Sequence, residues 1–76
     1  MRELIEYVAK SLAHDPDAVR VTEAEEEDGN IIIQLEVAPD DKGRIIGKGG
    51  RVAVAMRVLL RVAAVKQGTR ANLQII

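Results

Sequence analysis

The chain has 76 residues, 47% of them hydrophobic, with no cysteine and with Tyr7 as its only Phe, Trp or Tyr residue. The absence of cysteine excludes disulfides, thiolate metal sites and cysteine nucleophiles. The lack of aromatic residues excludes modules that stack bases on aromatic platforms, such as RRM, OB and cold-shock domains. The length predicts one small domain over residues 1–76 with an aliphatic core. Because no signal-peptide pattern or membrane-length apolar run is present, we expect a cytoplasmic protein without membrane contact.

The net charge of -1 conceals two halves of opposite sign. Residues 1–41 carry 12 acidic and 3 basic side chains, whereas residues 42–76 carry 8 basic side chains and no acidic one. Such a one-sided basic segment suits a polyanionic ligand. The alternative is that the two halves neutralise each other within the fold. We expect both to occur, with the acidic run Glu25–Asp28 lying solvated in a hairpin turn.

The N-terminal segment has the periodicity of an amphipathic helix from about Arg2 to Ala13. Its apolar residues fall on one helical face: Leu4, Ile5, Val8, Ala9 and Leu12. Pro16 cannot continue the helical hydrogen-bond ladder and disfavours helix in the residue before it, so the helix ends ahead of it. The only histidine, His14, is therefore expected to be a solvated residue at the helix end, and not a catalyst or a metal ligand.

The next segment predicts a β-hairpin. Val19–Thr22 alternates as a strand does, and Asp28–Asn30 has the composition of a tight turn. Ile31–Val37 then alternates with its odd-numbered residues apolar, which places them on one face of a second strand.

The C-terminal half predicts two helices and a last strand. Pro39 begins a short helix that runs to Ile46, and its acidic first turn complements the helix dipole. Gly43 within that helix costs about 1 kcal/mol relative to alanine, which indicates that a ligand or a neighbouring strand approaches closely there. Arg51–Lys66 forms a longer helix, and Ala71–Ile75 alternates as a strand. The fold class is therefore α+β, in the order α-β-β-α-α-β.

The junction between the two helices, Gly47-Lys48-Gly49-Gly50, allows a phosphate backbone to lie directly on the main chain. Gly50 also precedes a helix whose first amides have no internal partner and whose dipole is positive there. A P-loop is excluded, because the required spacing from Gly43 places Lys48 where its second glycine should stand, and no Ser or Thr follows. The dinucleotide fingerprint also fails, because Val52 stands at its third glycine. A glycine-rich turn between helices, without a ligand, remains as the structural alternative.

In this setting the chain resembles a type II KH domain, in which an α-β pair precedes a β-α-α-β unit that carries Ile-Gly-x-x-Gly. Ile46–Arg51 matches that motif, and Gly43–Arg51 resembles the small bacterial single-KH RNA-binding proteins of the KhpA type. The resemblance implies a three-stranded sheet with the helices packed on one face and about four unpaired nucleotides held across the loop. The RNA-binding residues that it implies are Gly47, Lys48, Gly49, Gly50, Arg51, Arg44 and Ile46. Gly49 departs from the family, where a larger polar residue is common, and is expected to loosen the loop.

Phosphates and bases are expected to contact different residues. Arg44, Lys48 and Arg51 would position the strand through its phosphates without reading sequence. Base reading is expected in a shallow groove with four boundaries: Ile45, Ile46, Val52 and the polar or edge groups of Ile31–Val37. Arg57 and Arg61 lie one helical turn apart, and either extend the basic track or mark the solvated face of the helix.

The long helix is apolar around much of its circumference. Its predicted core face consists of Val52, Met56, Leu60 and Ala63. A second apolar stripe, more than ninety degrees away by the ~100° step per residue, consists of Ala55, Val58, Leu59 and Val62. Either the first helix covers both faces, or the second stripe is an interface with another copy of the chain or with a second KH protein.

We therefore predict a non-enzymatic protein that clamps single-stranded RNA and acts as an RNA chaperone or post-transcriptional regulator, with no cofactor or metal. The resemblance implies a second KH protein of the KhpB/Jag type as partner, and the second apolar stripe of the long helix predicts a homodimer or a heterodimer with that protein. The alternative is a protein-interaction module whose basic half docks on an acidic partner, with a purely structural loop. A nucleotide-hydrolysing enzyme is disfavoured by the failed P-loop spacing, and Ser11 has no evident activating base.

Overall fold

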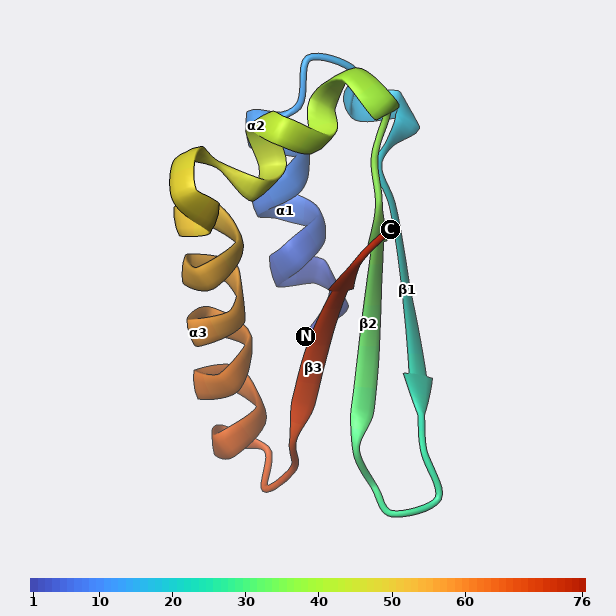
Figure 1. Cartoon of the computed structure of the whole chain (residues 1–76). Coiled ribbons are helices and arrows are strands. Elements are labelled where there is room, and N and C mark those ends of the chain that lie inside the picture. Colours follow the sequence, from blue (N-terminus) through green and yellow to red (C-terminus); the bar gives the residue numbers. More distant parts are fainter.

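The computed structural model describes residues 1–76 and confirms the predicted order of elements (Figure 1). The helices and strands are α1 (Arg2–Leu12), β1 (Arg20–Glu25), β2 (Ile31–Glu36), α2 (Lys42–Ile46), α3 (Arg51–Lys66) and β3 (Ala71–Ile75). Single turns of 3-10 helix precede β1, α2 and α3, at Pro16–Ala18, Pro39–Asp41 and Lys48–Gly50. Strand β1 extends to Glu25, beyond the alternating segment, because its last residues still pair with the start of β2.

The three strands form a mixed sheet in the order β1-β2-β3. Strand β1 pairs antiparallel with β2 through the predicted hairpin, where Gly29 has a φ of 88° and the Asn30 amide donates to the Asp28 carboxylate over 3.0 Å. Strand β3 pairs with β2 in parallel, and α2 and α3 provide the crossover that a parallel pair requires. Strand β2 is therefore central, and β1 and β3 are the two edges.

The helices pack on one face of this sheet, as the resemblance implied (Figure 1). On β2, Ile33 and Leu35 are buried, whereas Gln34 and Glu36 point to the opposite, exposed face. Every α-helix and strand contributes to the core or packs against it. The core cluster consists of Ile5, Ala9, Val19, Ile33, Leu35, Val37, Ile45, Met56, Leu60 and Leu73. The core is aliphatic apart from its methionine, as predicted, and the Tyr7 side chain lies outside it with 74% of its surface exposed.

The buried face of α3 differs in part from the prediction. Met56 and Leu60 are buried as predicted, but Ala53 and Ala64 are buried in place of the half-buried Val52 and Ala63. The helix is turned so that two alanines face inward, and small side chains let it approach its neighbours closely.

The second apolar stripe of α3, from Ala55 to Val62, faces solvent. Val58, Leu59 and Val62 are 45%, 46% and 51% exposed, and Ala55 is exposed beside them. The alternative that α1 covers both apolar faces of α3 is therefore wrong for the isolated chain. The stripe stays uncovered because α1 lies over the sheet beside α3 and reaches only one side of α3.

Candidate nucleic-acid interface

The glycine loop makes a sharp turn between α2 and α3 that L-amino acids with side chains would resist. Gly47 has φ 81° and ψ 166°, Gly49 has φ 64°, and Gly50 has φ 76°. The Gly47 amide donates to the Gly43 carbonyl over 2.8 Å, and the Gly50 amide donates to the Gly47 carbonyl over 3.0 Å. The first hydrogen bond ends α2 and the second forms the following turn of 3-10 helix, so the loop has a defined shape.

Gly47 is also the point of closest packing in the loop. A Cβ atom built on it would lie 2.9 Å from the Val52 backbone nitrogen and 2.5 Å from its Cγ2 atom. At Gly49 and Gly50 a Cβ atom would meet nothing within 4 Å. The first glycine therefore sets the contact between the loop and α3, while the other two leave open space on the solvent side, where another molecule can approach the main chain.

The start of α3 is an electropositive surface. Gly50 is its N-cap, no side chain caps the first amides, and no acidic residue lies in its first turn. These amides and the helix dipole favour an anion at this position. Lys48 and Arg51 are exposed on either side of the cap.

The basic side chains are little used within the fold. Of those in residues 42–76, only Arg44 forms an ion pair, at 3.9 Å from the Asp41 carboxylate. The acidic run Glu25–Asp28 is exposed at the hairpin, at the opposite end of the molecule from the glycine loop (Figure 1). The acidic and basic halves of the chain therefore do not neutralise each other by direct ion pairs. The basic side chains Lys48 and Arg51 beside the loop remain available to a ligand.

A groove lies between α3 and the open edge of β3, beside the helix face that begins at the glycine loop. Gly50, Val54, Arg57 and Arg61 share one face of the helix by their spacing of four, three and four residues. Between this face and β3 lies a hollow of about 130 Å³ lined by Arg57, Leu60, Arg61, Ala71, Asn72 and Leu73. Arg57 and Arg61 thus lie beside the groove.

The strand that borders this groove was not identified from the sequence. The prediction assigned its edge groups to Ile31–Val37, but β2 is hydrogen-bonded on both sides. The Arg70 carbonyl accepts from the Ile31 amide, and the Ile76 amide donates to the Leu35 carbonyl. Since main-chain groups alternate in direction along a strand, the amides and carbonyls of the intervening odd-numbered residues of β3 face the open edge. The apolar run Ile31–Ile33, which fills both faces of the strand, was the available signal for a central position.

The start of α2 is fixed by a buried carboxylate that the sequence analysis did not single out. Asp41 accepts hydrogen bonds from the backbone amides of Asp15 at 3.0 Å and His14 at 3.1 Å, and it is buried. These hydrogen bonds, with that from Asp15 the stronger influence, lower the pKa of the Asp41 carboxyl below its usual value. The carboxylate thereby joins the end of α1 to the helix that leads into the glycine loop.

Three residues near α2 differ in position from what the sequence indicated. Arg44 is half-exposed and lies against the α1 side, with its Nη2 atom 3.5 Å from Nδ1 of the exposed His14. Ile45 is fully buried, so it belongs to the core and does not border a groove, whereas Ile46 is 39% exposed. No strand approaches Gly43, because a Cβ atom there would meet nothing within 4 Å.

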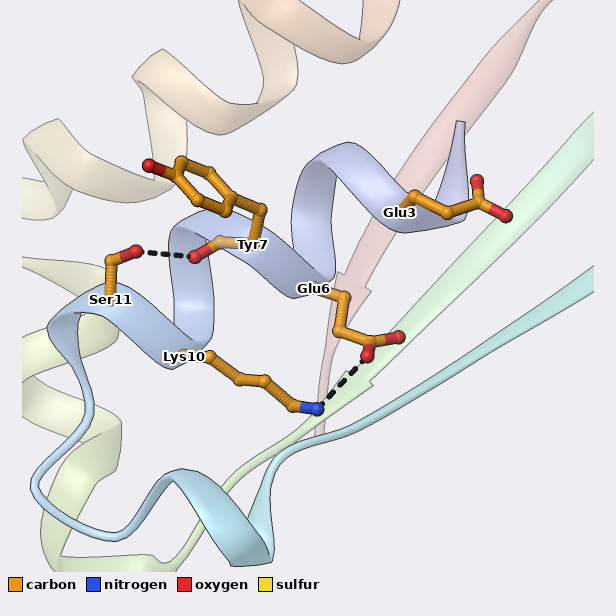
Figure 2. Close-up of a pocket in the computed structure, with 5 residues that line it drawn as sticks. All are labelled: Glu3, Glu6, Tyr7, Lys10 and Ser11. Carbon is orange, nitrogen blue, oxygen red and sulfur yellow. Dashed lines mark hydrogen bonds and ion pairs between the residues drawn. The ribbon is translucent and has the colours of Figure 1, made fainter.

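A second hollow, of about 440 Å³, lies on the outer face of α1 and has no evident chemistry (Figure 2). Lys10 pairs with Glu6 at 3.0 Å, and the Ser11 hydroxyl donates to the Tyr7 carbonyl over 2.7 Å. The serine is thus engaged with the main chain, with no base beside it. No group of three or more His, Asp or Glu side chains is arranged to hold a metal ion. None of the helices has the length and hydrophobicity needed to traverse a membrane.

Comparison with known proteins gives a consistent assignment. The model of the KhpA/KhpB KH domain matches residues 2–75. RNA-binding protein KhpA of Clostridium acetobutylicum is 47% identical over 76 residues, which is all of both chains. RNA-binding protein KhpA of Treponema pallidum is 47% identical over 74 residues, covering 97% of this chain and 91% of the relative.

A solved structure supports the fold alone. The crystal structure of Era in complex with MgGDPNP and nucleotides 1506–1542 of 16S ribosomal RNA aligns with a TM-score of 0.60 and 18% identity. The alignment covers 97% of this chain but only 28% of that one. From the Ile-Gly-x-x-Gly loop, the α-β-β-α-α-β topology and the match over nearly the whole length, the chain belongs to the KhpA/KhpB family of KH-domain proteins.

Proposed function

We propose that this protein binds single-stranded RNA, with the phosphates over the glycine loop and the bases in the groove between α3 and β3. The observation that carries the proposal is the loop itself, where glycines with positive φ expose the main chain at the uncapped start of α3. Lys48 and Arg51 add two formal charges there without a carboxylate partner. The relatives are named as RNA-binding proteins, which favours RNA as the polyanion.

The shape of the site favours weak and broad recognition. Its exposed apolar residues are aliphatic, including Val54 at 57% and Ile46 at 39% exposure, and no aromatic ring offers a stacking platform. Stacking on an aromatic ring contributes about 1–3 kcal/mol per base, which is not available here. A protein with such a site can contact many RNAs briefly, as a chaperone or post-transcriptional regulator does, and this is the role that we propose.

The loop is tested by reversing its charge while keeping its backbone. We expect the double variant Lys48→Asp with Gly49→Asp to lose RNA binding, because two carboxylates would repel the phosphates. Asparagine and aspartate tolerate the left-handed conformation of Gly49 better than other side chains do. The matched control is Lys48→Gln with Gly49→Asn, which makes the same demand on the backbone without negative charge.

Binding is measured by fluorescence anisotropy with a labelled oligouridine, and folding by circular dichroism. The control should weaken binding modestly, and both variants should retain the helical content of the wild type. If the double aspartate variant bound RNA as tightly as the control, the loop would not be the clamp, and the structural interpretation of the loop would be favoured.

The exposed stripe of α3 supports a second part of the proposal, which concerns partners. Ala55, Val58, Leu59 and Val62 form one contiguous apolar surface on the helix face that points away from the core. Isolated apolar residues are ordinary on a protein surface, but a contiguous patch marks an interaction site. We propose that this stripe pairs with the same stripe of a second copy about a two-fold axis, or with a second KH protein of the KhpB/Jag type. Arg57 and Arg61, on a different face of α3, would remain free for RNA.

A further inference from the structure

Arg57 extends from the middle of α3 to the open edge of β3. Its Nη2 atom donates to the Leu73 carbonyl over 3.4 Å. This distance is at the long limit for a hydrogen bond, so the contact is weak and a ligand can replace it at little cost. The guanidinium has no ion-pair partner, so most of its five N–H donors have no acceptor within the protein.

The main chain beside Arg57 has donors and acceptors in fixed positions. Leu73 lines the hollow and is 5% exposed, main chain included, so its amide and carbonyl are largely covered while Arg57 contacts the carbonyl. Both face away from β2, as do those of the other odd-numbered residues of β3. A planar base that lies in the hollow between α3 and β3 therefore meets a guanidinium and a backbone carbonyl that are already in contact with each other.

We infer that Arg57 is a specificity-determining residue that selects guanine or cytosine over adenine and uracil at the nucleotide on the open edge of β3. Guanine presents two adjacent acceptors, N7 and O6, that match the fork of a guanidinium. The N1–H donor lies next to O6, on the side where the Leu73 carbonyl can accept it. Cytosine presents the same order of groups, with O2 and N3 as adjacent acceptors and the N4 amino donor next to N3. Adenine and uracil have no two adjacent acceptors, because the N6 amino group of adenine and the N3–H of uracil stand between theirs, so a donor would face a donor. The inference rests on the proposed binding of RNA in this groove.

Arg61 has a different place in the same hollow. It lines the hollow one turn further from the glycine loop, and it makes no hydrogen bond to β3. We assign it to the phosphates, where a guanidinium contributes affinity without distinguishing bases. The pair Arg57 and Arg61 thus provides a specificity residue and its matched control on one helix.

The test uses a labelled uridine hexamer and a series of hexamers in which one uridine is replaced by guanine, adenine or cytosine at each position. We expect one position at which guanine and cytosine bind roughly five- to 150-fold more tightly than adenine and uracil, as for other bidentate arginine contacts to bases. The variant Arg57→Lys keeps the charge but loses the fork, so it should still bind the uridine hexamer and lose most of the preference. The variant Arg61→Lys should keep the preference, and thermal melts should show that both variants are folded.

Each outcome has one meaning. Equal affinity of the wild type for all four bases, or a preference for adenine or uracil, would overturn the inference. So would a preference for guanine and cytosine that survives in Arg57→Lys. Failure of the wild type to bind any hexamer at low salt would overturn the proposed function itself, which is a distinguishable result.

Discussion

Three glycines of the loop region make different structural demands, and their replacement by alanine should produce a graded series of stabilities. At Gly47, the combination of φ 81° and ψ 166° belongs to a region that only glycine adopts readily, which costs about 1–3 kcal/mol for alanine. The new Cβ atom would also lie 2.9 Å from the Val52 backbone nitrogen, which no side-chain rotation can relieve. We therefore expect Gly47→Ala to lower the free energy of unfolding by about 3 kcal/mol or more.

The other two positions provide internal controls. At Gly49, the left-handed conformation costs alanine about 1 kcal/mol, and the site is sterically open. At Gly43, which is helical, exposed and free of neighbours, alanine should raise the free energy of unfolding by up to about 1 kcal/mol. The free energy of unfolding should therefore be highest for Gly43→Ala, followed in order by the wild type, Gly49→Ala and Gly47→Ala.

The assay is thermal and urea unfolding followed by circular dichroism. A domain of this size is typically stable by roughly 4–11 kcal/mol, so the loss at Gly47 is a large fraction of the total. A loss of 3 kcal/mol should lower Tm by roughly 12–24 °C, which is far outside experimental error. Adding Val52→Ala to Gly47→Ala should restore only part of the loss, because the clash with the backbone nitrogen remains. A Gly47→Ala variant that melted with the wild type would refute the argument from backbone conformation and close packing.

Three further predictions concern RNA, acid and assembly. If three or four phosphates are neutralised, a plot of log affinity for single-stranded RNA against log salt concentration should have a slope of about -2 to -3. A slope near zero would contradict phosphate contacts. Duplex RNA should compete poorly for the site. Because the pKa of folded Asp41 is lowered from its usual value near 3.8, its carboxylate stabilises the fold fully above that value and less as the pH falls through the lower folded pKa. Asp41→Asn should therefore be less stable than the wild type at neutral pH and lose less stability below pH 4, as urea titrations at several pH values would show. Sedimentation equilibrium at tens of micromolar should show that the wild type associates with itself or with a second KH protein. The variant Val62→Asp should be monomeric and folded. A wild type that is monomeric and binds no second KH protein would contradict the interface.

The sequence alone determined most of what is local in this protein. The periodicity of Leu4 to Leu12 is that of a helix, and the alternation of Ile31 to Val37 is that of a strand, because side-chain direction follows directly from backbone period. The limits of α3, Arg51–Lys66, agree with the prediction because Gly50 comes directly before the helix and Gly68 lies two residues after it. The glycine loop could also be located, since its conformations depend on residue type more than on distant contacts.

The tertiary structure alone decided which surfaces these elements share. The rotation of α3 that buries Ala53 and Ala64 depends on packing against several other elements, and the helical pattern of a mostly apolar helix does not fix it. The open edge of the sheet belongs to β3, because that strand adds in parallel beside β2, and pairing partners are not encoded in the alternation of either strand. For the same reason the position of Arg57 against the Leu73 carbonyl, 16 residues apart, emerges only when the crossover closes. Local period determines the elements, whereas the location of the groove depends on contacts between residues distant in the chain.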